Sequence, residues 1–448
     1  MKFTADQEAA LQVFSQFEKA DKPYRCFILK GYAGTGKTTL ISHLVLRYKN
    51  ANKKVKLLAP TGRAAKVMSA YSQTPAFTIH KQIYFVADMQ DQSGLIRAKN
   101  LYKNTLFIVD EASMVGVESN QSEGSLLQDL LEYVYSGEGC SLLLVGDPGQ
   151  LPPVGQIDSP ALDLDFLNHQ YTGISTFTYT LKEVVRQASH SQIIENATFI
   201  RNLKQASTPY FINYGKEVLR IQGGELLDLL ETANQDGVGS FVMLTMSNKR
   251  VGLWNQEIRN RLFHYEEPLV RGESLMVVKN NYFWASDSEM GLIANGEMFF
   301  IVKINREEEL YGFTFIHAVV RFASESDKER SVICFKDTLF SDTPNLSRDR
   351  LKSLFFEIEK DYLTEKNKRK RYQLILKNPY FNALQIKYAY CVTAHKAQGG
   401  QWETVFVDFG FIPENMEKTE YLRWLYTCLT RAQNRVVLIN FPPEYFQN

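Results

Sequence analysis

The sequence lacks the features that mark secreted, disulfide-bonded and membrane-spanning proteins. Its 448 residues include five cysteines, and no two of them have C-x-x-C spacing. That pattern argues against a zinc site and a disulfide framework, and it fits a reducing compartment. No apolar run approaches the roughly 20 residues that a membrane span needs. The first 14 residues form an amphipathic, partly acidic pattern rather than a signal peptide, so we expect a cytoplasmic protein with no membrane partner.

An excess of charge of either sign is also missing. The 51 basic and 50 acidic residues leave a net charge of +1, so no field of the whole molecule attracts a polyanion. If nucleic acid binds, positive charge must line a groove instead. A hydrophobic content of 44% is ordinary for a soluble globular protein, and the length favours two to four domains. We find no repeat of fixed period and no low-complexity linker.

Short apolar runs alternate with helical patterns along much of the chain. The strands expected from these runs are 25–30, 54–60, 104–111 and 140–147 in the first half, then 241–248, 385–395, 403–410 and 434–440. Helical patterns at 38–48 and 62–71 follow the first two runs. Buried runs separated by helices predict parallel sheets and an α/β fold. The return of the pattern predicts two α/β lobes.

Two inserts interrupt these lobes. Residues 269–383 contain β-like segments, such as 313–322, and then a charged helical stretch with the run KNKRKR at 366–371. Residues 81–99 resemble a hairpin with QSG at its tip. The predicted domains are a first lobe (1–185) with the hairpin, a second lobe (186–268 plus 384–448), and an inserted β domain (269–383).

GYAGTGKT, residues 31–38, fits the phosphate-loop pattern and lies between an expected strand and an expected helix. Glycines allow backbone N–H groups to approach phosphate oxygens, and the start of the helix adds partial positive charge. Lys37 can reach the β- and γ-phosphates, and the Thr38 hydroxyl can bind Mg²⁺. The alternative is a chance glycine-rich turn. The expected nucleotide-binding residues of this loop are Gly34, Thr35, Gly36, Lys37, Thr38 and Thr39.

Acidic and amide side chains follow other strands. Asp110 and Glu111 end the run LFIVDE, at the edge of a parallel sheet where ligands bind. Asp110 is placed to hold Mg²⁺ and Glu111 to orient or deprotonate water, although an ordinary acidic strand end has the same letters. Gln150 in GDPGQLPPVG is a candidate γ-phosphate sensor, or part of a rigid loop around prolines. For Gln7, the residues themselves favour a helix capping box with Thr4.

Two distant arginines could supply charge to the γ-phosphate. Arg186 lies in LKEVVRQ and Arg431 in LTRAQNR. An arginine from outside the phosphate-loop lobe can stabilise phosphoryl transfer, and ATP would then lie between two lobes and drive their closure. Without that context, each arginine fits a solvated surface position.

The motifs, in this order, resemble superfamily 1 helicases, and most of all subfamily B, the RecD/Dda group. The matching motifs are Gln7, GYAGTGKT (31–38), APTGRAAKVM (59–68), TIH (78–80), VDEAS (109–113), GDPGQLPPVG (146–155), VVRQ (184–187), TMSNKR (245–250), TAHKAQG (393–399) and YTCLTRAQ (426–433). The resemblance covers nearly the whole chain. It implies two RecA-like lobes, a pin hairpin in the first and an SH3-like insert in the second. It also implies 5′→3′ translocation on single-stranded DNA, powered by ATP and Mg²⁺, with unwinding of duplexes and a role in DNA repair or recombination.

The resemblance also implies roles for single residues. It assigns Gln7 to adenine, and Gln150, Arg186 and Arg431 to the γ-phosphate. Related helicases often have Glu at the position of Gln401, where it contacts the ribose, so this assignment departs from the family pattern. The residues at family positions that face the DNA strand are Pro60, Thr61, Arg63, His80, Asn248 and His395. As isolated residues, the two histidines more often fit an ordinary core or surface position than a DNA contact.

The hairpin at 81–99 is the natural wedge at a junction of single- and double-stranded DNA, with Phe85 or Met89 stacking on the first base pair. A GTPase is disfavoured, because Val251 stands where the guanine-reading motif N-K-x-D requires Asp. An ATP-gated clamp or repair scaffold that holds DNA without unwinding it stays open. We expect a monomer that meets single-strand-binding or repair proteins.

Overall fold

The computed structural model describes residues 3–446, except for 87–94, 118–124, 186–190, 204–209, 238, 286–292, 324–327, 342, 344 and 413–415. The chain divides into two compact units. Unit 1 comprises Met1–Arg220, Gln398–Gln401 and Phe411–Asn448, and unit 2 comprises Ile221–Ala397 and Trp402–Gly410. The lobe boundaries expected from the sequence stay a prediction.

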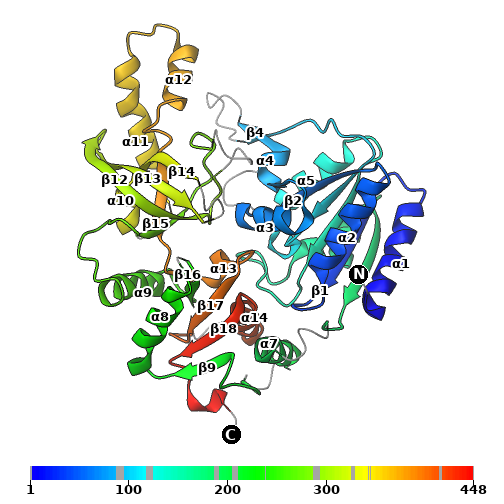
Figure 1. Cartoon of the computed structure of the whole chain (residues 1–448). Coiled ribbons are helices and arrows are strands. Elements are labelled where there is room, and N and C mark those ends of the chain that lie inside the picture. Colours follow the sequence, from blue (N-terminus) through cyan, green and yellow to red (C-terminus); the bar gives the residue numbers. More distant parts are fainter. Residues whose placement is uncertain are drawn as a thin grey trace. The chain divides into compact units, whose positions relative to one another are not determined.

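A six-stranded sheet with the order β3-β2-β6-β7-β1-β8 forms the centre of unit 1 (Figure 1). Its strands are β1 (Arg25–Gly31), β2 (Lys54–Ala59), β3 (Ala76–Thr78), β6 (Thr105–Val109), β7 (Ser141–Gly146) and β8 (Ser175–Leu181). Every neighbouring pair is parallel. β6 and β7 are buried along their whole length, which explains their continuous apolar runs. Unit 1 also holds the neighbouring strands β9 (Val218–Ile221, whose last residue falls in unit 2) and β18 (Ala432–Ile439).

Helices connect and cover these strands. Those of unit 1 are α1 (Ala5–Lys19), α2 (Lys37–Asn50), α3 (Gly62–Ser72), α4 (Ile79–Ile83), α5 (Leu126–Tyr135), α6 (Leu164–Gln170), α7 (Gln192–Asn202) and α14 (Lys418–Leu429). Short 3₁₀ turns occur at Ala112–Met114, Pro160–Leu162 and Pro443–Tyr445. The predicted amphipathic N-terminal helix is confirmed as α1, which buries Phe14 and Phe17. α2 begins directly after the glycine-rich loop.

The predicted hairpin is confirmed in its described part. Strands β4 (Tyr84–Val86) and β5 (Leu95–Arg97) pair in antiparallel register. Its base is tied to α5, because the Tyr84 hydroxyl donates to Asp129 at 2.5 Å and Arg97 contacts the same carboxylate at 3.1 Å. The tip lies outside the described residues. The hairpin therefore has a fixed base on unit 1.

The α/β part of unit 2 is built around β10 (Phe241–Thr245). This strand pairs in parallel with β16 (Cys391–Thr393) and with β17 (Trp402–Asp408). The helices of this part are α8 (Leu226–Gln235), α9 (Asn248–Arg261) and α13 (Ala394–Ala397), with a 3₁₀ turn at Gly223–Glu225. α9 starts at its N-cap Ser247, whose side chain accepts a hydrogen bond from the Arg250 N–H.

A closed five-stranded barrel forms the rest of unit 2. Its strands are β11 (Ser274–Val277), β12 (Met298–Leu310), β13 (Phe313–Phe322), β14 (Glu329–Phe335) and β15 (Leu384–Tyr388). β12 and β13 turn at Tyr311 and Gly312, which both have positive φ, as a tight hairpin turn requires. Phe299, Phe322 and Ile386 lie in the barrel core.

A helical module follows β14. It contains α10 (Asp337–Phe340), α11 (Arg348–Glu359), a 3₁₀ turn at Lys360–Tyr362 and α12 (Lys368–Leu376). In Figure 1, α11 and α12 lie side by side beyond the barrel strands. Leu354, Ile358 and Ile375 pack with residues of the barrel in one apolar cluster. The charged helical stretch predicted around 366–371 is thus confirmed, with α12 beginning inside it.

The structure corrects one expected strand. We predicted a single strand over 385–395, but β15 ends at Tyr388 in the barrel and β16 begins at Cys391 beside β10. The Asn255 side chain holds the break, because it accepts from the Cys391 N–H and donates to the Cys391 carbonyl. An uninterrupted apolar run carries no signal for a boundary that a distant side chain creates.

The predicted α/β class with a small β insert is confirmed. Four strands were missed, namely β3, β8, β9 and β14, because these segments are short or only partly buried. Within the described residues, no helix combines the length and the apolar character needed to cross a membrane.

Candidate active site

The loop after β1 has the backbone that phosphate binding requires. Gly34 and Gly36 adopt left-handed conformations with φ of 76° and 83°, which glycine adopts without strain. Gly36 is also the N-cap of α2. The loop therefore presents backbone N–H groups at the start of a helix, which favours an anion. These elements bring the predicted residues from Gly34 to Thr39 together.

Lys37 places a positive charge at this loop. Its ammonium donates to the carbonyls of Gly31 at 2.6 Å and Tyr32 at 3.0 Å, and it lies 3.9 Å from a carboxylate oxygen of Asp147. A Cβ on Gly31 would come within 2.9 Å of the Lys37 side chain, so glycine is needed there as well. The loop thus combines N–H donors with a held cation.

Asp110 and Glu111 lie at the carboxyl end of β6, as predicted. The Asp110 N–H donates to the Leu58 carbonyl of β2 at 3.0 Å, which fixes the residue at the sheet edge. Glu111 has φ of 53°, and its N–H donates to Asp110 Oδ1 at 2.9 Å. Burial raises the pKa of both carboxyl groups, while the charge of Lys37 opposes this rise. A carboxylate with a raised pKa is suited to accept a proton from water.

The oxygen donors at this edge fit magnesium. Mg²⁺ prefers hard oxygen ligands, and proteins often hold it with one or two carboxylates, a hydroxyl and nucleotide phosphates. Asp110 offers a carboxylate, and Thr38 offers an exposed hydroxyl on the first turn of α2. In the part of the chain that the structure describes, no three His, Cys, Asp or Glu side chains form a metal cluster. The donor set therefore suits a metal that arrives with a nucleotide.

Asp147 links the loop to a distant helix. The Tyr426 hydroxyl on α14 donates to Asp147 Oδ2 at 2.7 Å and accepts from the Ala33 N–H at 2.8 Å. The Gly149 N–H donates to the other oxygen of Asp147 at 2.8 Å. Gln150, in the same turn, is buried, and its Oε1 has no hydrogen-bond partner within the described residues. An unpaired buried amide oxygen is costly unless a ligand or water satisfies it, so it suits a sensor position.

Arg431 is buried and lies in the same compact unit as the phosphate loop. Only 4% of its surface is exposed, so the alternative of a solvated surface arginine, which the sequence left open, is wrong. Its guanidinium donates to the carbonyls of Thr427 and Gly400 and to the Thr430 hydroxyl, each at 3.3 Å. Its charge also opposes the effect of burial on the pKa of Glu111. The distant arginine therefore acts at the acidic sheet edge.

Gln7 forms the predicted capping box. Its Oε1 accepts from the Thr4 N–H at 3.1 Å, and its own N–H donates to the Thr4 hydroxyl at 3.2 Å. The other end of the side chain reaches the phosphate loop, where Nε2 donates to the Thr35 carbonyl at 3.2 Å. Cap and loop contact therefore occur together, a combination that neither sequence alternative contained.

The strand-facing residues predicted after β2 lie at the start of α3. Thr61 is the N-cap of α3, and its side chain accepts from the Ala64 N–H. Arg63 donates to the Gln401 carbonyl at 3.2 Å, and burial lowers its pKa to about 10, with a further contribution from the Arg431 charge. Pro60 precedes this turn and is partly buried. The side chain of Gln401 is exposed and accepts from Gln433.

Two of the predicted residues are histidines whose environment favours the neutral imidazole. His80 lies on α4 and His395 on α13, and burial lowers the pKa of each. Asn248 is exposed at the first position of α9. It lines a groove of about 740 Å³ in unit 2, together with Lys249, Phe340 and Lys396.

Two of the predicted residues, Arg186 and Met89, lie outside the described residues. For Phe85 the structure gives the backbone, which pairs with Ile96.

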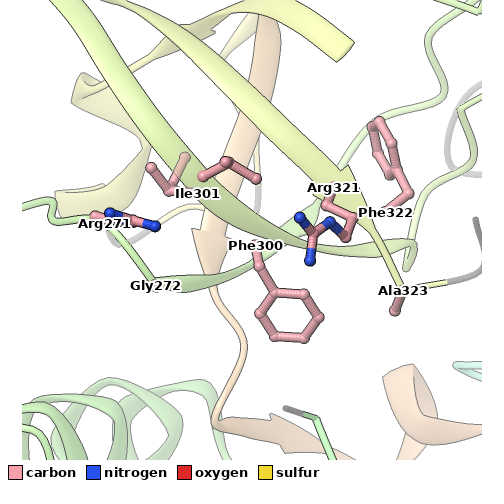
Figure 2. Close-up of a pocket in the computed structure, with 8 residues that line it drawn as sticks. Arg271, Gly272, Phe300, Ile301, Arg321, Phe322 and Ala323 are labelled. Carbon is pink, nitrogen blue, oxygen red and sulfur yellow. The ribbon is translucent and has the colours of Figure 1, made fainter. Parts of the chain in front are cut away.

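A second hollow, of about 370 Å³, lies on the barrel, where Phe300 sits between Arg271 and Arg321 (Figure 2). No residue predicted for the site lines it.

Sequence reasoning missed three side chains that contact the site. Asp147 and Tyr426 lie inside motifs named above, but no role was predicted for either. For Asp147 the available signal was an acidic residue directly after an apolar strand. Tyr71 hydrogen-bonds to Asp110, and no sequence pattern indicated this contact.

Comparison with known families agrees with this geometry. The model of the AAA domain matches residues 2–217, and that of the UvrD-like helicase C-terminal domain matches residues 388–439. Among curated proteins, the ATP-dependent DNA helicase Pif1 of Campylobacter jejuni is 26% identical over 93% of this chain and 89% of that protein. The ATP-dependent RecD2 DNA helicase of Deinococcus radiodurans is 32% identical, over 39% of this chain and 21% of that protein.

A solved structure shares the fold. The Pif1 helicase from Bacteroides in complex with ADP-AlF3 and ssDNA superposes with a TM-score of 0.51 at 16% identity, over 100% of this chain and 95% of that one. This likeness confirms the two RecA-like lobes with a β insert. The family models and these relatives together support a RecD/Dda/Pif1-like helicase of superfamily 1B, and they indicate an ATP-dependent DNA helicase enzyme.

Proposed function

We propose that this helicase moves 5′→3′ on single-stranded DNA and separates duplexes, driven by ATP hydrolysis at the phosphate loop of unit 1. One observation carries the proposal. Arg431 is buried, and its positive charge favours the ionised form of Glu111 by opposing the rise in pKa that burial causes. Lys37, in the phosphate loop, opposes the same rise. This arrangement suits phosphoryl transfer, in which charge builds up on the γ-phosphate oxygens.

Each residue of the site has a proposed role in ATP binding or hydrolysis. The loop N–H groups and Lys37 bind the phosphates, while Thr38 and Asp110 would hold Mg²⁺, which neutralises charge on the β- and γ-phosphates when bound. Glu111 orients water and accepts its proton. Gln150 and Arg431 contact the γ-phosphate, and we assign the same role to Arg186. Gln7 is proposed to read adenine with the amide that contacts Thr35, and Gln401 to contact the ribose.

We propose that the DNA strand runs along Pro60, Thr61, Arg63 and His80, and along Asn248 and His395. Hydroxyls, amides and a few cations suit a phosphate backbone that is gripped without reading its sequence. The groove beside Asn248 supports this assignment, because it combines lysines with the exposed ring of Phe340. The relatives named Pif1 and RecD2 are DNA helicases, and the Bacteroides Pif1 structure contains ssDNA.

A forked-DNA assay tests the proposal. Strand separation should require a 5′ overhang and hydrolysable ATP, and a 3′ overhang should give none. Strand release with a non-hydrolysable analogue, or retention that is indifferent to hydrolysis, would instead support the second candidate, an ATP-gated DNA clamp. The clamp stays a candidate because a DNA clamp and a translocating helicase would use the same nucleotide-binding pocket.

The wedge has its own test. Alanine at Phe85 or Met89 should lower unwinding while leaving DNA-stimulated ATP hydrolysis largely intact. Equal loss of both activities would reject the wedge role, and normal unwinding by both variants would place the wedge elsewhere.

A further inference from the structure

Tyr71, near the C-terminal end of α3, makes a contact that the proposed mechanism does not use. Its hydroxyl donates to Asp110 Oδ2 at 2.7 Å. The other oxygen of the carboxylate, Oδ1, accepts from the Glu111 N–H at 2.9 Å. Two donors on two different oxygens fix the plane of a carboxylate, so the remaining lone pairs of Asp110 have a defined direction.

The backbone of Tyr71 contacts the helix that follows the phosphate loop. The Ser42 hydroxyl on α2 donates to the Tyr71 carbonyl at 3.2 Å and to the Thr38 carbonyl at 2.9 Å. Tyr71 therefore contacts the Asp110 carboxylate directly and contacts α2 through Ser42, one turn after Thr38.

The other end of α3 faces the proposed DNA strand. Thr61 caps this helix, and Arg63 lies in its first turn. A helix of 11 residues is about 16 Å long at 1.5 Å per residue. α3 is continuous from Arg63 to Tyr71, so a shift of the whole helix at its strand-facing end would also move the Tyr71 hydroxyl at the opposite end.

We propose that Tyr71 is a positioning residue that orients the Asp110 carboxylate for Mg²⁺ and couples that orientation to DNA held at the start of α3. The inference rests on the proposed role of Asp110 as the magnesium carboxylate. Partners that orient a metal ligand commonly change metal affinity 10–100-fold when they are removed. The hydroxyl, and not the ring, carries the role.

The test measures magnesium binding rather than turnover. A fluorescent, non-hydrolysable ATP analogue is bound to the full chain while Mg²⁺ is titrated, with and without an oligothymidine strand. For Tyr71→Phe, the half-saturating Mg²⁺ concentration should rise about tenfold or more. In the wild type the oligonucleotide should lower this concentration, and in Tyr71→Phe the effect should be lost.

Two controls separate the possible failures. Tyr380→Phe removes a similar bond, a hydroxyl that donates to Glu308 at 2.6 Å on the barrel, and should leave the titration unchanged. Asp110→Asn should raise the Mg²⁺ requirement strongly. If Asp110→Asn has no effect, the assignment of Asp110 is wrong. If Asp110→Asn has its effect and Tyr71→Phe has the wild-type Mg²⁺ requirement or keeps the oligonucleotide effect, the inference about Tyr71 is overturned.

Discussion

The two compact units each bury an arginine, and they treat its charge differently. In unit 2, Arg259 is 3% exposed and forms a paired contact with Glu273, with Nε to Oε1 at 2.9 Å and Nη2 to Oε2 at 3.0 Å. In unit 1, the guanidinium of Arg431 is equally buried, but its hydrogen bonds among the described residues go to two carbonyls and a hydroxyl at 3.3 Å.

The difference fits a structural role for Arg259 and the catalytic role that we propose for Arg431. A buried cation is costly unless an opposite charge compensates it. Glu273 supplies that charge for Arg259, so the pair links α9 to the residue directly before the barrel strand β11 without need of a ligand. Arg431 forms its hydrogen bonds with neutral groups, and its charged neighbour is Glu111, the proposed general base, so its charge acts at the edge where an anion would bind. In an ATP-hydrolysing protein, the anion that suits this position is the γ-phosphate.

The largest expected effect comes from removing the available charge. Arg431→Ala should lower ATP hydrolysis by about 1000-fold or more, as loss of an arginine that stabilises the transition state does in related phosphoryl transfer. A steady-state ATPase assay at saturating single-stranded DNA measures this. Arg321→Ala on the barrel surface, where the ion pair with Glu329 is half exposed, is the matched control and should retain activity. A loss of less than tenfold for Arg431→Ala would contradict the functional interpretation.

Breaking the compensated pair should affect folding instead. Glu273→Ala leaves Arg259 buried without its carboxylate, and should lower the free energy of unfolding by about 3–5 kcal/mol. Urea denaturation measures the loss. Arg259→Met combined with Glu273→Leu removes both charges and should recover much of the stability. If the single variant loses under 1 kcal/mol, as exposed pairs do, the pair is not the structural element described here.

A third substitution weakens the link between helix α14 and the phosphate loop. Tyr426→Phe removes the hydroxyl that joins Asp147 to the Ala33 N–H, and should lower the free energy of unfolding by about 1–3 kcal/mol, because buried polar groups lose a partner. Chemical denaturation with and without an ATP analogue measures the change. Tyr380→Phe, at a more exposed hydroxyl on the barrel, should cost less. Equal losses would remove the distinction between the two hydroxyls.

The smallest expected effect is a pH dependence with one histidine in each unit. Burial lowers the pKa of His80 and of His395, so the folded state favours their neutral forms. The unfolded chain then binds more protons as the pH falls below about 6.5, and stability decreases from pH 7 towards pH 5. His80→Gln and His395→Gln should each flatten this decrease in urea denaturation at the two pH values. An unchanged slope would show that the histidines titrate alike in both states.

Much of the fold was predictable because strand periodicity and glycine-rich loops are local signals. The runs 25–30 and 140–147 became β1 and β7, and the predicted glycine-rich loop lies between β1 and a helix, with positive φ at Gly34 and Gly36. Asp110 was placed correctly because it directly follows an apolar strand.

The contacts that complete the site were not predictable, because they join residues far apart in the chain. Tyr71 and Asp110 are 39 residues apart, and Tyr426 and Ala33 are 393 apart. The sequence around Arg431 contains no pattern that distinguishes a buried arginine from an exposed one. Likewise, the break between β15 and β16 depends on Asn255, more than 100 residues upstream.

The separation of Ala33 and Tyr426 also bears on biosynthesis. A nascent chain emerges from the ribosome in order, and contacts of high sequence separation form late. The loop of residues 31–38 is translated early, but the hydroxyl and guanidinium from α14 and the turn after it arrive almost 400 residues later. If Tyr426 and Arg431 have their proposed roles, fragments that end before these residues should bind or hydrolyse ATP poorly, even though they contain the loop of residues 31–38.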